Sequence, residues 1–119
     1  MKHDEDDEQA ALFDWAAYIP ALRWLHAIPN GGNRNPIEAK RLKRQGVRAG
    51  VSDVFLPVPV PPYHGMYIEM KKATGPVRVT PQQKAFIRDM ELQGYKCAVC
   101  RGFDEARKTI SDYMRTQNG

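Results

Sequence analysis

Two carboxylates and a lysine stand near the middle of the sequence, on two short stretches with the composition of β-strands. Asp53 lies in the stretch 50–56, and Glu69 and Lys71 lie in the stretch 66–71. Side chains alternate along a strand, so Glu69 and Lys71 share one face, and a hairpin can bring Asp53 beside them. Two carboxylates can hold a hard divalent cation such as Mg²⁺ or Mn²⁺, and an adjacent lysine can orient or deprotonate a water. The spacing therefore indicates metal-assisted chemistry on a phosphate group.

The same pattern also has a simpler interpretation, because a carboxylate two residues before a lysine occurs by chance on solvated edge strands. The connection between the two stretches favours a hairpin, since it carries prolines at 57, 59, 61 and 62 followed by His64 and Gly65. The choice between a site and an edge strand depends on the rest of the chain.

Composition indicates an ordinary globular protein. With 119 residues, 42% hydrophobic and 27% charged, the chain is predicted to form one domain, residues 1–119, small enough for a dimer to be considered. No apolar run approaches the length of a membrane span, and the acidic N-terminus lacks the pattern of a signal peptide. We therefore expect a cytoplasmic protein with no membrane partner.

Basic residues outnumber acidic ones outside the N-terminus. The first eight residues hold five acids, and the other 111 residues carry 17 basic and nine acidic side chains. Such a balance favours a polyanionic partner, nucleic acid first. The densest segment, 34–48, contains Glu38 as its only acid and predicts phosphate contacts, although a solvated helix face would have the same composition. Its six bases are Arg34, Lys40, Arg41, Lys43, Arg44 and Arg48.

The two cysteines, Cys97 and Cys100, form a single C-x-x-C motif on a stretch with the composition of a strand. Zinc would need two further ligands, and His3, His26 and His64 are scattered without ligand spacing. A thioredoxin-like motif belongs at a helix N-terminus. We therefore predict buried structural thiols.

The remaining elements alternate between helix and strand. Helices are predicted at 4–19, 36–45 and 104–114, with one more opened by Thr80 and Pro81 and ended by Gly94. Strands are predicted at 23–28, 50–56, 66–71 and 95–100, and a turn rich in glycine and asparagine at 29–33. This order predicts an α/β fold with a mixed central β-sheet flanked by helices.

Two further polar residues have positions that a site could use. Apolar residues at helical spacing run from Leu12 to Ile19, and Glu8 continues this stripe, where a carboxylate is costly unless it is paired or metal-bound. Glu8 could equally be the fifth residue of a solvated acidic run. Gln83 stands three residues after Thr80, so it can complete a capping box, face a site, or do both. The apolar side of that helix is assigned to Phe86, Ile87, Met90 and Leu92.

The ordered set of motifs resembles the VRR-NUC domain (virus-type replication-repair nuclease), a branch of the PD-(D/E)xK restriction-endonuclease-like superfamily. The resemblance covers about residues 5–115, and the order is more specific than any one motif. The motifs are Glu8-Gln9, Pro29-Asn30-Gly31-Gly32, the segment 46–53, Glu69-Met70-Lys71, Thr80-Pro81-Gln82-Gln83 and the strand that follows Gly94.

The resemblance implies a restriction-endonuclease-like sheet with a metal site at its middle strands. Asp53 and Glu69 match the metal-binding acids of the family, and the backbone carbonyl of Met70 would be a further ligand. Lys71 matches the catalytic lysine. Ser52 stands where the superfamily's name expects proline, a position that this branch does not strictly keep.

The resemblance extends to two helices and to the substrate. Glu8 matches a first-helix glutamate of the site, which could join the metal ligands, and Gln83 matches a glutamine that points to the site. Small stand-alone members encoded by bacterial viruses resemble junction-resolving enzymes, which act as homodimers on four-way (Holliday) DNA junctions. The proline-rich loop 57–65 looks specific to this chain.

We therefore expect an endonuclease, dependent on Mg²⁺ or Mn²⁺, that hydrolyses phosphodiester bonds in branched DNA as a homodimer. The alternative is a non-catalytic nucleic-acid-binding protein in which the segment 34–48 makes the contacts and the acids are incidental. The complete set of Asp53, Glu69 and Lys71 favours the enzyme, because a binding protein has no use for it. RNA as the substrate stays open.

Overall fold

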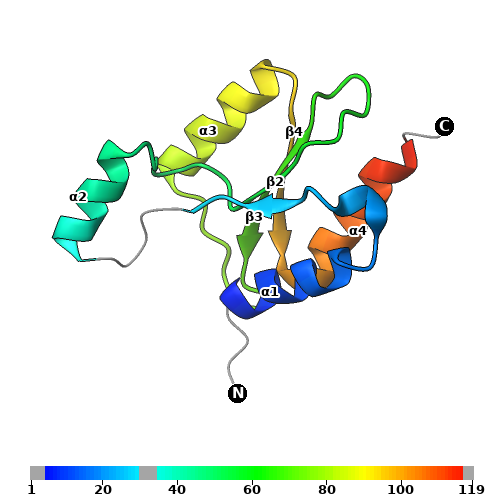
Figure 1. The fold of residues 1–119 in the computed structure, drawn as a ribbon, viewed down its shortest axis with the longest axis horizontal. Helices are drawn as coiled ribbons and strands as arrows, with labels where there is room; N and C mark the ends of the chain where they lie inside the picture. Colours follow the sequence, from blue (N-terminus) through cyan, green and yellow to red (C-terminus); the bar gives the residue numbers. More distant parts are fainter. Residues whose placement is uncertain (1–4, 30–34, 117–119) are drawn as a thin grey trace.

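A four-stranded mixed β-sheet forms the centre of the computed structural model, which describes residues 5–29 and 35–116 (Figure 1). The strands lie side by side in the order β1 (His26–Ala27), β2 (Val54–Leu56), β3 (Met66–Lys71) and β4 (Lys96–Arg101). β2 is antiparallel to both of its neighbours, whereas β3 and β4 are parallel. The predicted α/β fold with a mixed central sheet is confirmed.

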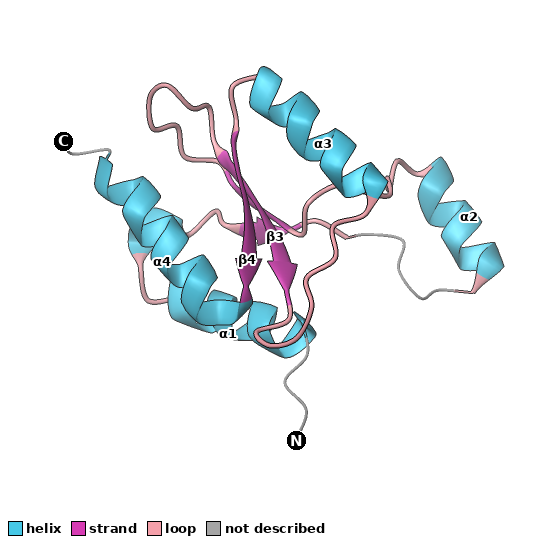
Figure 2. Ribbon diagram, turned by 180° about the vertical axis from the view of Figure 1, so that it is seen from behind, coloured by secondary structure: helices cyan, strands magenta, loops and turns pink. Residues whose placement is uncertain are grey.

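Helices cover the two faces of this sheet unequally. α1 (Glu5–Ala16) and α4 (Gly102–Arg115) pack together on one face, and α3 (Pro81–Leu92) lies on the other (Figure 2). α2 (Pro36–Arg44) stands apart from the sheet and has no buried residue (Figure 1). A short 3₁₀ helix, Pro20–Leu22, joins α1 to β1.

The core lies between the sheet and the pair α1 and α4. Ile68 and Met70 of β3 are fully buried there, together with Leu12 of α1 and Ile110 of α4. Each such side chain contributes about 1.5–3 kcal/mol by leaving water. Strand alternation places the intervening residues of β3 on the opposite face, which carries the polar residues of interest.

The parallel pairing of β3 with β4 requires a crossover connection, and α3 supplies it. Its start is fixed locally, because Thr80 and Gln83 form the predicted capping box around Pro81 at the first helical position. The N-terminus of α3 therefore has a defined place above the end of β3.

Some predicted boundaries are wrong. The first helix ends at Ala16 and not at 19, because Pro20 holds Ile19 in an extended conformation, and Ala16 takes the buried position one turn after Leu12. The strand predicted at 23–28 is reduced to His26–Ala27. The sequence predicts Leu92 on the apolar side of α3, but it is 80% exposed. Six residues of helix rotate its position by about 120° from that of Phe86.

Other predictions hold with small shifts. α4 begins at Gly102, two residues before the predicted start, and β4 covers 96–101 where 95–100 was expected. Most of the turn predicted at 29–33 lies outside the described residues. Among the described helices, none is long and apolar enough to cross a membrane.

Candidate active site

The hairpin of β2 and β3 brings the two predicted acids together. Its register pairs Val54 with Ile68, so Asp53, one residue before, stands opposite Glu69, one residue after. One carboxylate oxygen of Asp53 accepts a hydrogen bond from the backbone N–H of Met70 at 2.8 Å. Glu69 is only 3% exposed. The two carboxylates therefore lie side by side on the α3 side of the sheet, with Glu69 buried and Asp53 partly exposed.

The side chain of Gln83 connects the acid, the lysine and the start of α3. Its Nε2 donates to Glu69 Oε2 at 2.9 Å, and its Oε1 accepts from Lys71 Nζ at 3.2 Å. The same Oε1 also accepts from the backbone N–H of Thr80 at 3.0 Å, which is the capping contact. The two roles that the sequence left open for Gln83 are therefore both present.

Lys71 completes the cluster. Its Nζ lies 3.5 Å from Glu69 Oε2, and both side chains are at least nine-tenths buried. Burying a carboxyl group beside an ammonium group carries a desolvation cost that attraction alone often fails to offset, so stability is a poor reason for such a contact. The carboxylate of Asp53 lies beside this pair, and buried ionisable groups with strongly perturbed pKa values occur more often at functional sites than elsewhere.

The protonation of Glu69 reflects this crowding. Burial is the largest cause that raises its pKa, repulsion by Asp53 and a hydrogen bond with Asp53 raise it further, and Lys71 lowers it, with the result at about 8. Repulsion between the two carboxylates contributes to this raised pKa, and a divalent cation held between them would relieve it. The pair is therefore suited to a divalent cation in chemical terms.

The donor set fits a hard cation that keeps waters. In the described ranges, no three or more His, Cys, Asp and Glu side chains form a group that could hold a metal ion. Mg²⁺ is often held by only one or two carboxylates and completes its shell with waters and substrate phosphate. Asp53 and Glu69 meet that requirement, whereas the predicted contribution of the Met70 carbonyl stays a prediction.

Glu8 is placed differently from the two acids. It does lie on the inner side of α1, as its spacing indicated, but its Oε1 accepts a hydrogen bond from the backbone N–H of Phe103 at 2.7 Å. It therefore caps the N-terminus of α4, where a negative charge is favourable. The part of the chain that the structure describes does not group Glu8 with Asp53 and Glu69, so a role for it in metal binding stays a prediction.

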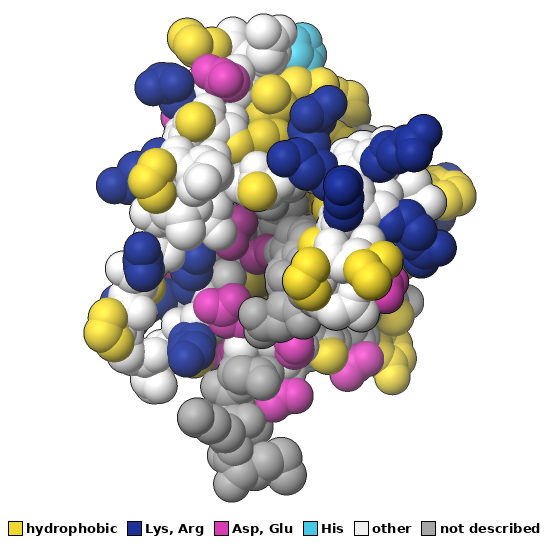
Figure 3. All heavy atoms as spheres, turned by 90° about the vertical axis from the view of Figure 1, so that its left-hand side faces the viewer, with side chains coloured by type: hydrophobic (Ala, Val, Ile, Leu, Met, Phe, Trp, Pro, Cys, Tyr) yellow, Lys and Arg dark blue, Asp and Glu magenta, His cyan; other side chains and the backbone are white. Residues whose placement is uncertain are grey.

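The predicted phosphate-binding residues are solvent-accessible. Those within the described residues, Lys40, Arg41, Lys43, Arg44 and Arg48, are all exposed, and Arg34 lies outside the described residues. On the side of the molecule where α2 lies, acidic side chains occupy a hollow with Lys and Arg side chains on both sides (Figure 3). A polyanion entering this hollow would meet basic groups before it reached the acids.

Gly50 has a structural role that the sequence did not reveal. Its φ is +92°, and a Cβ atom there would lie 2.6 Å from the backbone oxygen of Gln82. The segment leading to Asp53 thus passes directly against the first turn of α3. A glycine followed by a strand was the available signal, but the contact partner could not be inferred from it.

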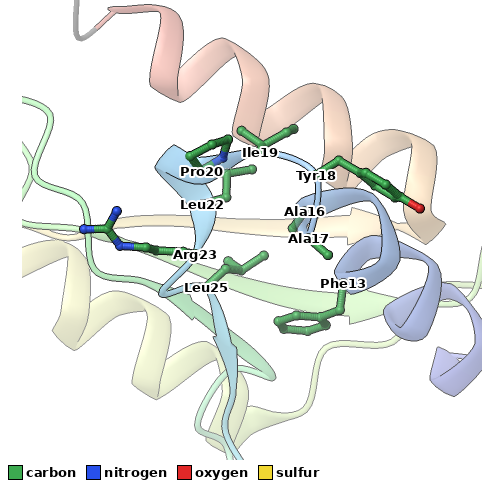
Figure 4. Close-up of a pocket in the computed structure, with 9 residues that line it drawn as sticks. All are labelled: Phe13, Ala16, Ala17, Tyr18, Ile19, Pro20, Leu22, Arg23 and Leu25. Atoms are coloured by element: carbon green, nitrogen blue, oxygen red, sulfur yellow. The ribbon is translucent and has the colours of Figure 1, made fainter.

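A pocket elsewhere in the described residues has no chemistry of this kind. A pocket of about 400 Å³ lies where α1 meets the 3₁₀ helix, lined mainly by apolar residues such as Phe13, Leu22 and Leu25, with Arg23 at its edge (Figure 4). None of the predicted site residues lines it. The two cysteines also lack the features of metal ligands. Cys100 is buried and Cys97 is half-buried, and burial raises the pKa of both thiols, as expected of structural cysteines.

The mixed sheet with paired acids on its two middle strands defines the class, a restriction-endonuclease-like α/β fold. The model of the VRR-NUC domain matches residues 5–104, so the chain belongs to the VRR-NUC family, a family of nucleases. A solved structure described as a VRR_NUC domain protein is similar with a TM-score of 0.83 and 30% sequence identity, over 98% of this chain and 92% of the other. No curated protein matches the chain.

Proposed function

We propose that the protein is an endonuclease, dependent on Mg²⁺ or Mn²⁺, that hydrolyses phosphodiester bonds in branched DNA, with four-way junctions as its preferred substrate and a homodimer as its working form. The observation that carries the proposal is the buried cluster in which Gln83 hydrogen-bonds both Glu69 and Lys71. The opposing carboxylate of Asp53 completes it. A protein that only binds DNA gains nothing from burying these charges.

In this proposal each residue has one task. Asp53 and Glu69 hold the cation, which when bound supplies activation of a water and neutralisation of charge on the phosphate. Lys71, held by Gln83, orients the attacking water and assists its deprotonation, and the proton passes to solvent. The water oxygen forms a bond to phosphorus, the bond from phosphorus to the 3′ oxygen breaks, and the 3′ oxygen takes up a proton from a solvent water.

The exposed bases of α2 and Arg48 would contact the DNA backbone on either side of the cut. A homodimer would present two such sites to the two strands of a branched substrate. In the same proposal, residues 1–119 form one nuclease domain.

The test compares a labelled four-way junction with a linear duplex of the same sequence, incubated with Mg²⁺, Mn²⁺ or EDTA. We expect metal-dependent cutting of the junction by wild type and a loss of roughly 10²–10⁴-fold in Lys71→Ala, with DNA binding nearly unchanged. Exposed Lys72→Ala is the matched control, since its side chain lies outside the cluster. Equal cutting of both substrates would remove the junction preference, and binding without cutting under any metal would favour the non-catalytic protein.

A further inference from the structure

The sheet face that carries the acid pair continues into a row of aromatic rings. β1, β2 and β3 place His26, Phe55 and Tyr67 at the same register, one on each strand. The ring centroids of His26 and Phe55 are 5.8 Å apart, and those of Phe55 and Tyr67 are 4.5 Å apart. We call these three residues the aromatic row.

The aromatic row is aligned with the acid pair. Phe55 lies two residues after Asp53 on β2, and Tyr67 lies two residues before Glu69 on β3, so all four share one face. At about 3.3 Å per residue the row is about 7 Å from the acids along the strands. This distance corresponds to about two nucleotide steps of a stacked DNA strand.

The inner and outer ends of the row differ in exposure. Tyr67 contacts Phe86 of α3 at 5.0 Å and Tyr95 at 5.4 Å, so its end is covered by protein. In the described part of the chain α3 is the helix on this face, and it packs against β4. His26 at the other end is exposed. Its Nδ1–H donates to the carbonyl of Trp24 at 2.9 Å, which fixes the orientation of the ring.

The face of the molecule that carries the acids matches a nucleic acid in its chemistry. On this face hydrophobic side chains lie above the acids, with Lys and Arg side chains beside them (Figure 3). Partly exposed rings inside a basic surface are the arrangement with which proteins stack unpaired bases while basic groups hold the backbone. A base within a duplex has both faces covered by its neighbours, so only an unpaired base can use the row.

We propose that one unpaired nucleobase packs at the open end of the aromatic row, stacked on one of the His26 and Phe55 rings with the other ring against its edge, about two nucleotides from the phosphate that the acid pair cuts. The proposal rests on the proposed nuclease function and gives it a substrate requirement. DNA that offers an unpaired nucleotide at this distance binds more tightly than a continuous duplex, because the base gains an aromatic partner that paired bases cannot reach.

The first experiment needs no variant. Affinity is measured in EDTA, so that no cutting occurs, for a duplex with an unpaired arm in which each of the first four unpaired positions in turn is a normal nucleotide or an abasic one. We expect one position at which loss of the base weakens binding roughly tenfold. Equal affinity for the abasic and complete arms at every position would overturn the proposal.

The second experiment assigns the effect to the row. The fluorescent base 2-aminopurine is placed at the sensitive position, and its quenching on binding is compared in wild type, His26→Ala, Phe55→Leu and Tyr18→Ala. The first two variants should lose most of the quenching and most of the abasic effect. Tyr18 is 88% exposed and lies beyond α1, on the other side of the sheet, so its variant should behave like wild type. Unchanged quenching in both His26→Ala and Phe55→Leu would refute the assignment.

The two proposals fail separately. Base stacking in EDTA without any metal-dependent cutting would support the role of the aromatic row and refute the nuclease function. Metal-dependent cutting with no effect of an abasic position on affinity would support the nuclease function and refute the role of the aromatic row.

Discussion

Replacing Glu69 with glutamine tests whether the carboxylates of Asp53 and Glu69 repel each other in the metal-free protein. Glutamine has nearly the same shape, and its carbonyl can still accept the hydrogen bond that Gln83 Nε2 donates to Glu69. It cannot ionise, however. In the wild type the pKa of Glu69 is raised from 4.5 to about 8, mainly by burial and then by Asp53.

The sign of the effect follows from which state holds the proton more tightly. The folded protein keeps Glu69 protonated at pH values where the unfolded chain has already lost that proton. This contribution to stability is complete below the ordinary pKa and is lost as the pH rises toward 8. Between pH 5.5 and 7 the free energy of unfolding should fall by up to about 1.4 kcal/mol per pH unit, or roughly 2 kcal/mol in all.

The assay is urea unfolding of metal-free wild type and Glu69→Gln across this pH range, followed by tryptophan fluorescence. Trp15 packs edge-on against Phe103 at 6.4 Å and reports the contact between α1 and α4. The difference in free energy of unfolding between the two proteins removes the contribution of groups that titrate alike in both. As the pH rises from 5.5 to 7, we expect the stability of Glu69→Gln to increase relative to that of the wild type by roughly 2 kcal/mol.

Adding Mg²⁺ or Mn²⁺ should reverse this trend in the wild type alone, since the cation binds the ionised pair. At a hundred times the dissociation constant the gain is about 2.7 kcal/mol. Parallel pH curves for the two proteins would refute the account of a crowded carboxylate pair. An equal response of both proteins to metal would place the cation elsewhere.

Substitutions at three further residues, Gln83, Glu8 and Gly50, each paired with a comparison variant, probe the site and the packing around it. Gln83→Ala removes the amide that hydrogen-bonds Glu69 and Lys71, and with it half of the capping box. We expect the rate of cleavage to fall roughly 10- to 100-fold and the urea midpoint of unfolding to fall as well. The control Gln82→Ala, at an exposed position, should leave the rate and the midpoint unchanged. Glu8→Ala should lower the free energy of unfolding by roughly 1 kcal/mol, because the cap of α4 is lost. Glu8→Gln keeps a carbonyl acceptor and should lower this free energy by less. Equal losses in the two variants would contradict the capping role of Glu8. Gly50→Ala should destabilise more than Gly46→Ala in the same urea assay. Both glycines have positive φ, but a Cβ at Gly46 meets nothing within 4 Å, so its variant should lose only roughly 1 kcal/mol.

The parts of the fold that the sequence predicted well are those set by neighbouring residues. The capping box of Thr80 and Gln83 depends on four consecutive residues, and it is present. Alternation along β3 separates the buried Ile68 and Met70 from Glu69 and Lys71, as expected. In both cases the chemistry that decides the structure lies within one element.

The parts that the sequence could not supply depend on distant residues. The acceptor role of Glu8 needs Phe103, which no local pattern connects to it. The close approach of Gly50 to Gln82 needs the placement of α3. The alignment of His26 with Phe55 needs the register of β1, a strand of two residues that carries almost no pattern of its own.

The bond between Glu8 and Phe103 also has a consequence for the making of the protein. Its partners are 95 residues apart, so during synthesis the first helix emerges long before the backbone N–H of Phe103 that donates to Glu8 exists. Until then Leu12 and Ala16, which are buried in the finished protein, have no α4 to cover them. The ribosome-bound chain should therefore expose this helix to chaperones and proteases until α4 has left the exit tunnel.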